Sequence, residues 1–241
     1  MYKGKRVSVI LPTYNEKDSI RMVINDFFDT GYVDEVLVIN NNAAPGTDKE
    51  VAQTAALQIF ETKQGYGFAT QRGLAEAKGD LLVICEPDGT FFGHDIIKLL
   101  AYSEDFDVVF GTRTTSKLIL EGANMGFFLR IGNWAVAKLM EALFLTSALT
   151  DVGCTMRLLS RNAYDKIKSQ FTIGASHFGP ELMCLVITNR ISFMEIPVKY
   201  APRVGVSSVT GNKFVAFSLG MRMILLILKY RIRSLFSISP K

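Results

Sequence analysis

The chain has 241 residues, of which 49% are hydrophobic and 21% charged, with a formal net charge of +4 at pH 7 and a mean hydropathy of +0.21. This length fits one α/β domain with appendages or two small domains, and the composition excludes an extended disordered chain. The small charge excess excludes extensive binding to duplex nucleic acid, so we expect no nucleic-acid partner. It suits an ordinary basic surface, or contact with nucleotide phosphates or acidic lipid headgroups. The apolar content exceeds that of a typical soluble domain, so we expect some apolar surface to face lipid or a partner.

The first half of the chain alternates between the periods of strands and helices. Expected strands cover residues 6–12, 33–40, 58–63, 80–88 and 107–113. Expected helices cover residues 16–28, 47–56, 67–79 and 94–103. Thr47 and Glu50 have the spacing of a capping box at the start of the second helix. This alternation predicts an α/β fold with a mainly parallel sheet and helices on both faces, which binds its ligands beyond the carboxyl ends of the strands.

The pattern changes after about residue 115, where segments 124–145 and 214–236 predict two amphipathic helices. Polar side chains share one arc of the first helix: Arg130, Asn133, Lys138 and Glu141. Basic side chains share one face of the second helix: Arg222, Lys229 and Arg233. Because charges interrupt both segments, neither offers the ~20 consecutive apolar residues of a spanning helix. We expect both helices to lie in a membrane interface, near anionic headgroups; the alternative is that they pack on the domain or in a dimer.

The cysteines and the N-terminus both favour a cytoplasmic location. Cys85, Cys154 and Cys184 are widely spaced in apolar or small-residue contexts and show no CxxC spacing, so we expect reduced cysteines in the core. The chain passes directly from basic residues into a short apolar run, which is interrupted too early for a signal peptide.

Polar segments follow several expected strands and would meet at one rim of the sheet. One of these segments carries Glu86 and Asp88 around Pro87, with Gly89 next. Two carboxylates at this spacing can hold one Mg²⁺ or Mn²⁺ ion, which commonly keeps waters and substrate phosphates as its other ligands. Pro87 keeps Glu86 extended, and Gly89 lets the backbone turn close to a ligand. The alternative is that acidic residues before glycine form an ordinary turn.

Four segments resemble a known family in their order and spacing: "VSVILPTYNE", "DEVLVINNNAAPGTD", "KQGYGFATQRGLAEAKGDLLVICEPDGT" and "DVVFGTR". They resemble the family 2 inverting glycosyltransferases of the GT-A fold, and among these the polyprenyl-phosphate (dolichol-phosphate) sugar transferases. The resemblance extends over roughly residues 6–210. It implies a Rossmann-like GT-A domain over residues 1–211, with an amphipathic helical insertion at about 121–146. Residues 212–241 would then form a C-terminal amphipathic helix at the membrane interface.

The resemblance also implies which residues bind the metal and the donor. The family's Asp-x-Asp motif aligns with residues 86–88, so Asp88 is the expected ligand of Mg²⁺ or Mn²⁺, with Glu86 as a second ligand or a contact to sugar or ribose. Thr90 stands where relatives often place a third metal-side ligand. The remaining expected donor-binding residues are Pro12, Tyr14, Glu16, Asn40, Asn41, Gln64, Gly65, Arg203 and Ser207. Asn40 and Asn41 occupy the place of a usual Asp, and Ser208 replaces a usual Lys, for which Lys213 is a substitute.

Arg113 and Arg130 match positions where these relatives place arginines on the acceptor phosphate. The stretch 151–161 resembles another segment of the family; it supplies Arg157 as a third arginine for the acceptor phosphate, and Asp151. Guanidinium groups suit a phosphate because they bind it in a bidentate fork. An ionised lipid phosphate needs no general base, whereas a hydroxyl acceptor requires one such as Asp151. The expected catalytic residues are therefore Asp88, Arg113 and Arg130, with Asp151 for a hydroxyl acceptor, and the metal and arginines stabilise charge on the leaving diphosphate.

The resemblance thus implies an inverting, metal-dependent hexosyltransferase that moves a sugar from a UDP- or GDP-linked donor to a polyprenyl phosphate. We expect it to be peripheral at the cytoplasmic face of a membrane, as a monomer or a homo-oligomer. Two alternatives remain open. One is the same fold acting on a saccharide or protein hydroxyl with Asp151 as base. The other is a catalytically degenerate sugar-nucleotide-binding protein.

Overall fold

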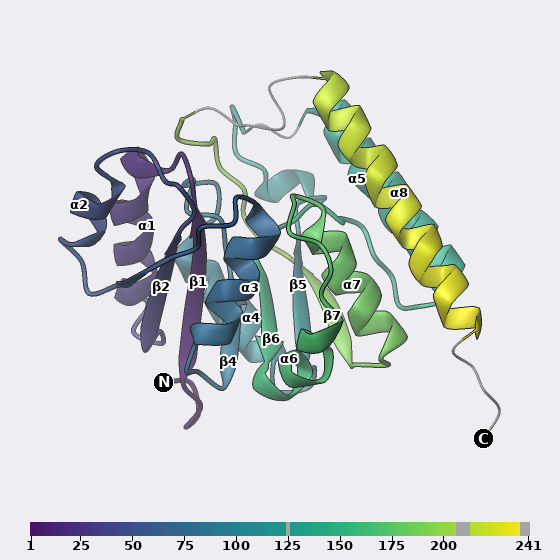
Figure 1. Ribbon diagram of the computed structural model, residues 1–241, viewed down its shortest axis with the longest axis horizontal. Helices are drawn as coiled ribbons and strands as arrows, with labels where there is room; N and C mark the ends of the chain where they lie inside the picture. Colours follow the sequence, from purple (N-terminus) through teal and green to yellow (C-terminus); the bar gives the residue numbers. More distant parts are fainter. Residues whose placement is uncertain (124–125, 206–212, 237–241) are drawn as a thin grey trace.

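A computed structural model describes residues 1–123, 126–205 and 213–236, with the backbone alone for 127 and 213–215 (Figure 1). The strands are β1 (Val7–Thr13), β2 (Glu35–Asn40), β3 (Leu57–Phe60), β4 (Leu81–Ile84), β5 (Val108–Thr112), β6 (Arg157–Ser160) and β7 (Phe193–Pro197). The helices are α1 (Lys17–Asp29), α2 (Thr47–Val51), α3 (Tyr66–Glu76), α4 (Ile96–Tyr102), α5 (Phe127–Phe144), α6 (Arg161–Ile167), α7 (Phe178–Thr188) and α8 (Lys213–Phe236). Short 3₁₀ turns cover Gly93–Asp95, Ser116–Leu118 and Lys168–Gln170.

Within the described ranges, seven strands form one sheet in the order β3-β2-β1-β4-β6-β5-β7. Neighbouring strands are parallel except β6, which runs antiparallel to both β4 and β5. The expected α/β fold with a mainly parallel sheet is therefore confirmed. Strands β2 and β3 lie on one side of β1, and β4 lies on its other side. The order of the strands therefore reverses between β1 and β4, and their carboxyl ends form a topological switch point.

Burial on both faces explains why the central strands are almost continuously apolar. Every residue of β1, β2, β4 and β5 is buried, as is typical of parallel strands covered by helices on both sides. Successive side chains alternate between two cores, so that Ile10 and Leu82 face one and Val9 and Val83 the other. Helices α1 and α4 cover the second core, and α3, α7 and parts of α5 and α8 cover the first.

The expected capping box at residues 47–50 is wrong. Gly46, with φ near 90°, precedes the first helical residue, and no side chain caps the helix. The Thr47 hydroxyl donates to the Ala44 carbonyl at 2.7 Å, and Glu50 pairs with Arg21 of α1. The helix also ends at Val51 instead of residue 56.

The two late helices form, and each buries one face on the domain. Figure 1 shows α5 and α8 running alongside each other at the edge of the molecule. Val136, Ala137 and Met140 of α5 share a core with Ile227 and Tyr230 of α8. Among the residues described, no helix combines the length and apolar character needed to cross a bilayer. The cysteines Cys85, Cys154 and Cys184 are free and buried, as expected.

Candidate active site

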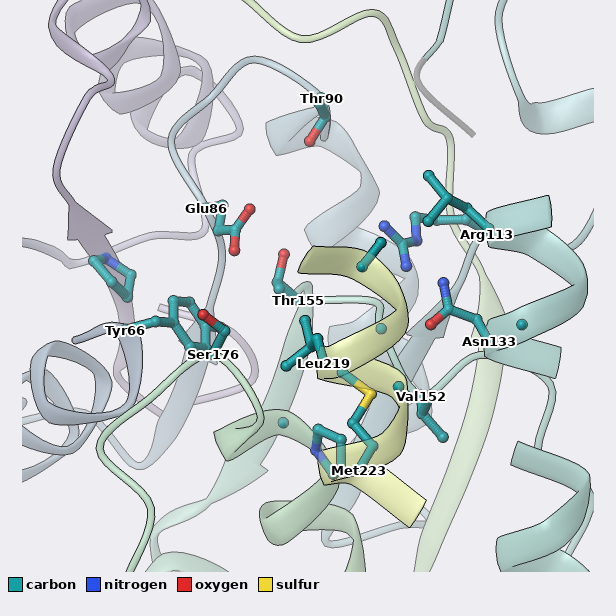
Figure 2. Close-up of a pocket in the computed structure, with 18 of the residues that line it drawn as sticks. Tyr66, Glu86, Thr90, Arg113, Asn133, Val152, Thr155, Ser176, Leu219 and Met223 are labelled. Carbon is teal, nitrogen blue, oxygen red and sulfur yellow. The ribbon is translucent and has the colours of Figure 1, made fainter. Parts of the chain in front are cut away.

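A cavity of about 1220 Å³ opens beyond the carboxyl ends of β1 and β4. Its lining comes from the segments after β1 and β4, the start of α3, the segments 152–157 and 200–203, and helices α5 and α8. Figure 2 shows Glu86 and Arg113 pointing into this cavity from opposite sides, with Leu219 and Met223 of α8 below them. The cavity therefore has charged groups at the sheet and apolar groups along the helices.

Asp88 is held by a tight turn just after β4. Its Oδ1 accepts hydrogen bonds from the backbone N–H of Thr90 at 3.0 Å and from the Thr90 hydroxyl at 2.6 Å. Gly89 has φ near 77°, which glycine adopts without strain. The two hydrogen bonds from Thr90 therefore orient the carboxylate of Asp88. Asp88 is only 1% exposed and does not itself border the cavity. Thr90, expected near a metal, thus acts here on Asp88.

Arg203 brings three carboxylates together from segments far apart in the sequence. Its Nη2 lies 2.5 Å from Asp88 Oδ2 and 3.1 Å from Glu86 Oε2, and its Nη1 lies 3.9 Å from Glu16 Oε1. Backbone hydrogen bonds from Ala201 to the Thr90 carbonyl and from Val204 to the Asp88 carbonyl hold this segment in place. One guanidinium therefore lies among three acidic side chains and offsets only part of their negative charge.

The acidic group carries more negative charge than Arg203 can compensate. Burial raises the pKa of Glu86 to about 7, the charge of Asp88 adds to this shift, and Arg203 opposes it. Burial also raises the pKa of Glu16, although the backbone N–H of Tyr14 and the charge of Arg203 counteract it. A further cation at this site would stabilise the ionised carboxylates.

Most of the expected donor-binding residues line the cavity: Pro12, Tyr14, Glu16, Asn41, Gln64, Gly65, Glu86 and Arg203. Asn41 also braces the neighbouring segment, because its Nδ2 donates to the carbonyls of Glu61 and Lys63 and its Oδ1 accepts from the Gly65 N–H, each at 2.8 Å. Asn40 does not border the cavity; its Oδ1 accepts from the Ala43 N–H and closes a turn. Its placement does not support a donor contact.

Ser207 and Ser208 lie outside the described residues, as does the side chain of Lys213. The structure therefore leaves their expected roles at the donor diphosphate as predictions.

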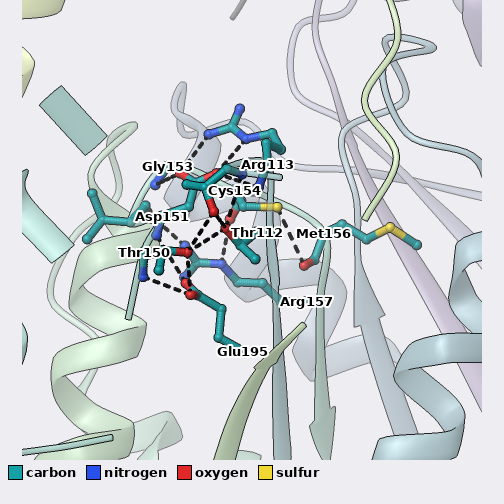
Figure 3. A network of polar contacts seen from close by, with 11 residues as sticks. Thr112, Arg113, Thr150, Asp151, Gly153, Cys154, Met156, Arg157 and Glu195 are labelled. Atoms are coloured by element: carbon teal, nitrogen blue, oxygen red, sulfur yellow. Dashed lines mark hydrogen bonds and ion pairs between the residues drawn. The ribbon is translucent and has the colours of Figure 1, made fainter. Parts of the chain in front are cut away.

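Asp151 forms a buried, fully bonded ion pair with Arg113. The two side chains meet in a fork at 2.8 and 3.0 Å, and Asp151 also accepts from the backbone N–H groups of Arg113 and Gly153 (Figure 3). Burial alone would raise the pKa of Asp151, but Arg113 and these N–H groups hold it below its ordinary value. A general base must reach the proton it removes. The side chain of Asp151 has no exposure, so this geometry does not support the role of base.

A second carboxylate supports the same loop from beneath. Glu195 of β7 accepts from the Thr150 N–H at 2.7 Å, the Thr150 hydroxyl at 2.6 Å and the Asp151 N–H at 3.0 Å. Burial raises the pKa of Glu195 to about 7, and its hydrogen bonds with Thr150 and Asp151 oppose that shift. The network in Figure 3 thus fixes the Arg113 guanidinium at the cavity wall.

The three arginines expected at the acceptor phosphate take different places. Arg113 lines the large cavity. Arg157 also reaches it, but its guanidinium donates to the carbonyls of Cys154, Val152 and Gly179 at 2.6–2.9 Å, so it braces the backbone. Arg130 borders a separate pocket of about 270 Å³ beside Thr114 and Trp134. Its placement does not support a contact with an acceptor in the large cavity.

Asn133, Tyr66, Thr155 and Ser176 line the cavity and were not predicted as site residues. Asn133 belongs to the polar arc recognised in segment 124–145, so that arc was the signal for it. Gly153 lets the side chains of Asn133 and Arg113 lie close to its backbone, because a Cβ at this position would lie 2.7 Å from Asn133 Oδ1 and 2.9 Å from Arg113 Nη2. Tyr66 and Thr155 lie in stretches that carried the family resemblance, although no role was assigned to them there, and Ser176 carries no local sequence signal.

The family described as Glycosyl transferase family 2 matches residues 8–168. The chain belongs to glycosyl transferase family 2. The glycosyltransferase is 26% identical over 205 residues to the low-salt glycan biosynthesis hexosyltransferase Agl6 of Haloferax volcanii, covering 83% of this chain and 48% of Agl6. It is also 26% identical over 215 residues to the uncharacterized glycosyltransferase Rv0539 of Mycobacterium tuberculosis, covering 87% of this chain and 92% of that protein. The chain thus spans about half the length of Agl6.

Solved structures resemble the glycosyltransferase in fold. Glucosyl-3-phosphoglycerate synthase from Mycobacterium tuberculosis, in complex with Mn²⁺, UDP-glucose and phosphoglyceric acid, has a TM-score of 0.73 at 17% identity, covering 95% of this chain and 80% of that one. A structure described as a mycobacterial protein has a TM-score of 0.75 at 17% identity, covering 95% and 76%. These likenesses confirm the expected GT-A fold.

Proposed function

We propose that this glycosyltransferase moves a sugar, with inversion, from a UDP- or GDP-linked donor to a polyprenyl phosphate. The observation that carries the proposal is the division of the cavity into two parts. Tyr14, Glu16 and Glu86 line the part near the sheet, where a nucleotide diphosphate would bind. Side chains of α5 and α8 form an apolar wall: Leu129, Val136, Phe217, Leu219, Met221, Met223 and Ile224. Such a wall suits a hydrocarbon chain better than a saccharide.

The donor end has the chemistry of a divalent-metal site. Asp88 and Glu86 supply hard oxygen donors, and the surplus negative charge around Arg203 would be relieved by a second cation. Among the described residues, no three His, Cys, Asp or Glu side chains are placed to hold a metal by themselves. We therefore propose that Mg²⁺ or Mn²⁺ is held by Glu86, which lines the cavity, and by Asp88 once Arg203 moves from Asp88 Oδ2 to the diphosphate. The donor diphosphate supplies the remaining ligands. The synthase that resembles this chain in fold was crystallised with Mn²⁺ and UDP-glucose.

The chain's own residues then perform three tasks. Thr90 orients the carboxylate of Asp88, and Arg203 supplies a positive charge beside the diphosphate. Arg113, fixed by Asp151, offers a cation at the opposite wall of the cavity, where an acceptor phosphate would lie. When bound, the metal stabilises the charge that builds on the leaving diphosphate. A lipid phosphate is already ionised, which agrees with the absence of a free base at Asp151.

We expect transfer of labelled sugar from a UDP- or GDP-linked donor to undecaprenyl phosphate in detergent, giving a product soluble in organic solvent. EDTA should stop the transfer, and Mn²⁺ or Mg²⁺ should restore it. A water-soluble product with saccharide or peptide acceptors, and none with the lipid phosphate, would overturn the proposed acceptor. Donor binding without turnover under all conditions would favour the degenerate binding protein.

Replacement of Arg203 should separate metal binding from donor binding. In the Arg203→Gln variant we expect Mn²⁺ to bind the nucleotide-free protein about tenfold more tightly, because three carboxylates lose their counter-charge. Donor affinity should fall at the same time. Mn²⁺ titration by electron paramagnetic resonance measures the first effect and calorimetry with UDP the second. Arg72→Gln is the matched control, since Arg72 pairs with Glu76 on the exposed side of α3. Unchanged Mn²⁺ affinity in Arg203→Gln would count against the metal site.

A further inference from the structure

Helix α8 presents an apolar stripe to solvent on the side opposite its buried face. We call the following side chains the outer stripe: Phe217, Met221, Leu225, Leu228, Ile232 and Leu235, which are 38–71% exposed. Their spacing of three and four residues places them on one side of the helix. The opposite side, with Ile227 and Tyr230, is buried in the domain. Contiguous apolar surface of this kind marks an interaction site.

The charges beside the outer stripe indicate which kind of partner covers it. Segment 213–236 contains no Asp or Glu, and its charged residues are all basic: Lys213, Arg222, Lys229, Arg231 and Arg233. Arg222 and Lys229 are exposed and lie along one border of the stripe. Two copies joined through their outer stripes would bring these like charges together. An anionic lipid surface supplies both the apolar phase for the stripe and the opposite charge for its border.

The outer stripe is continuous with the wall of the cavity. Phe217 and Met221 belong to the stripe and also line the cavity. Phe128, at the start of α5, lines the same cavity and is 84% exposed. Because these three side chains both line the cavity and are exposed, the apolar part of the cavity reaches the surface where the outer stripe begins. Helices α5 and α8 lie side by side at this edge of the molecule (Figure 1).

We propose that the outer stripe docks α8 flat on an anionic bilayer, with Arg222 and Lys229 among the lipid headgroups and the cavity open toward the lipid phase. The docking itself does not depend on the identity of the substrate. Its consequence rests on the proposed function: an acceptor with a long hydrocarbon chain enters the cavity sideways from the membrane, along Phe217 and Met221.

Flotation with lipid vesicles, without any nucleotide sugar, tests the docking. We expect the intact protein to float with vesicles containing phosphatidylglycerol and to bind pure phosphatidylcholine vesicles more weakly. The Leu225→Ser/Ile232→Ser variant, and separately the Arg222→Glu/Lys229→Glu variant, should each lower the partition coefficient by about tenfold or more. The test uses point substitutions because deletion of α8 would also remove its inner face from the core.

Matched controls separate docking from general effects of polarity and charge. Leu57→Ser/Phe60→Ser removes exposed apolar side chains from β3, and Lys78→Glu/Lys166→Glu reverses two exposed charges elsewhere; both variants should float like the intact protein. Equal flotation of the stripe variants would overturn the proposal. So would failure of the intact protein to float, or sedimentation as a dimer that the stripe substitutions dissociate. Flotation without lipid-linked product would instead contradict the proposed function and leave the docking intact.

Discussion

The Asp88→Asn variant is expected to lose donor turnover by a factor of about 10² to 10³, the range found when one preorganised charge-stabilising group is removed. Asparagine keeps the size of the side chain and can still accept from Thr90, but it lacks the negative charge that faces Arg203. The proposed metal would therefore lose its main protein ligand. Steady-state kinetics with saturating Mn²⁺ measures the loss.

Two further measurements make this result specific. The circular dichroism spectrum should stay unchanged, and nucleotide-dependent Mn²⁺ binding should weaken together with kcat. Asp18→Asn on the exposed side of α1 is the control and should keep full activity. Near-normal turnover in Asp88→Asn would exclude Asp88 as the metal ligand and remove the basis of the proposed mechanism.

Asp151→Asn is expected to act mainly on stability. Removal of one partner from a buried ion pair costs about 3–5 kcal/mol, because the remaining charge is left without compensation. For a chain of this size the melting temperature should fall by roughly 10 °C. Thermal and urea unfolding measure the effect, and activity is compared well below the new melting temperature. The lowered pKa of Asp151 has the same origin, so its contribution to stability is present above its unfolded pKa and is lost as the pH falls through the folded value.

A double variant identifies the cause of that loss. Arg113→Gln combined with Asp151→Asn should be less destabilised than the sum of the two single variants, since neither buried charge remains. If Asp151 were a general base, Asp151→Asn would instead lower kcat by about 10² to 10⁴ with little change in melting temperature. That outcome would restore the alternative of a hydroxyl acceptor.

The elements of the first half of the sheet follow from short stretches of sequence. Runs such as residues 9–12 and 36–39 are apolar at every position, which is typical of a strand covered on both faces. Helix α1 likewise shows its buried stripe in the sequence. Strand β6 carries no comparable signal, because it has four residues and its antiparallel partners are β4 and β5, far away in the chain. The predicted capping box does not form, because Gly46 precedes the helix and Glu50 pairs with Arg21 on another helix.

The sequence by itself therefore determined the α/β class, the family and the acidic segment at residues 86–88. The class follows from alternating strand and helix periods, the family from the order and spacing of four segments, and the acidic segment from one short motif. Only the tertiary structure decided what the charged side chains do. Arg203 reaches Asp88 across 115 positions, and Asp151 is occupied by Arg113 instead of being free as a base. A motif shows that a charge is present, but its partner, its burial and hence its pKa depend on which distant segments fold against it.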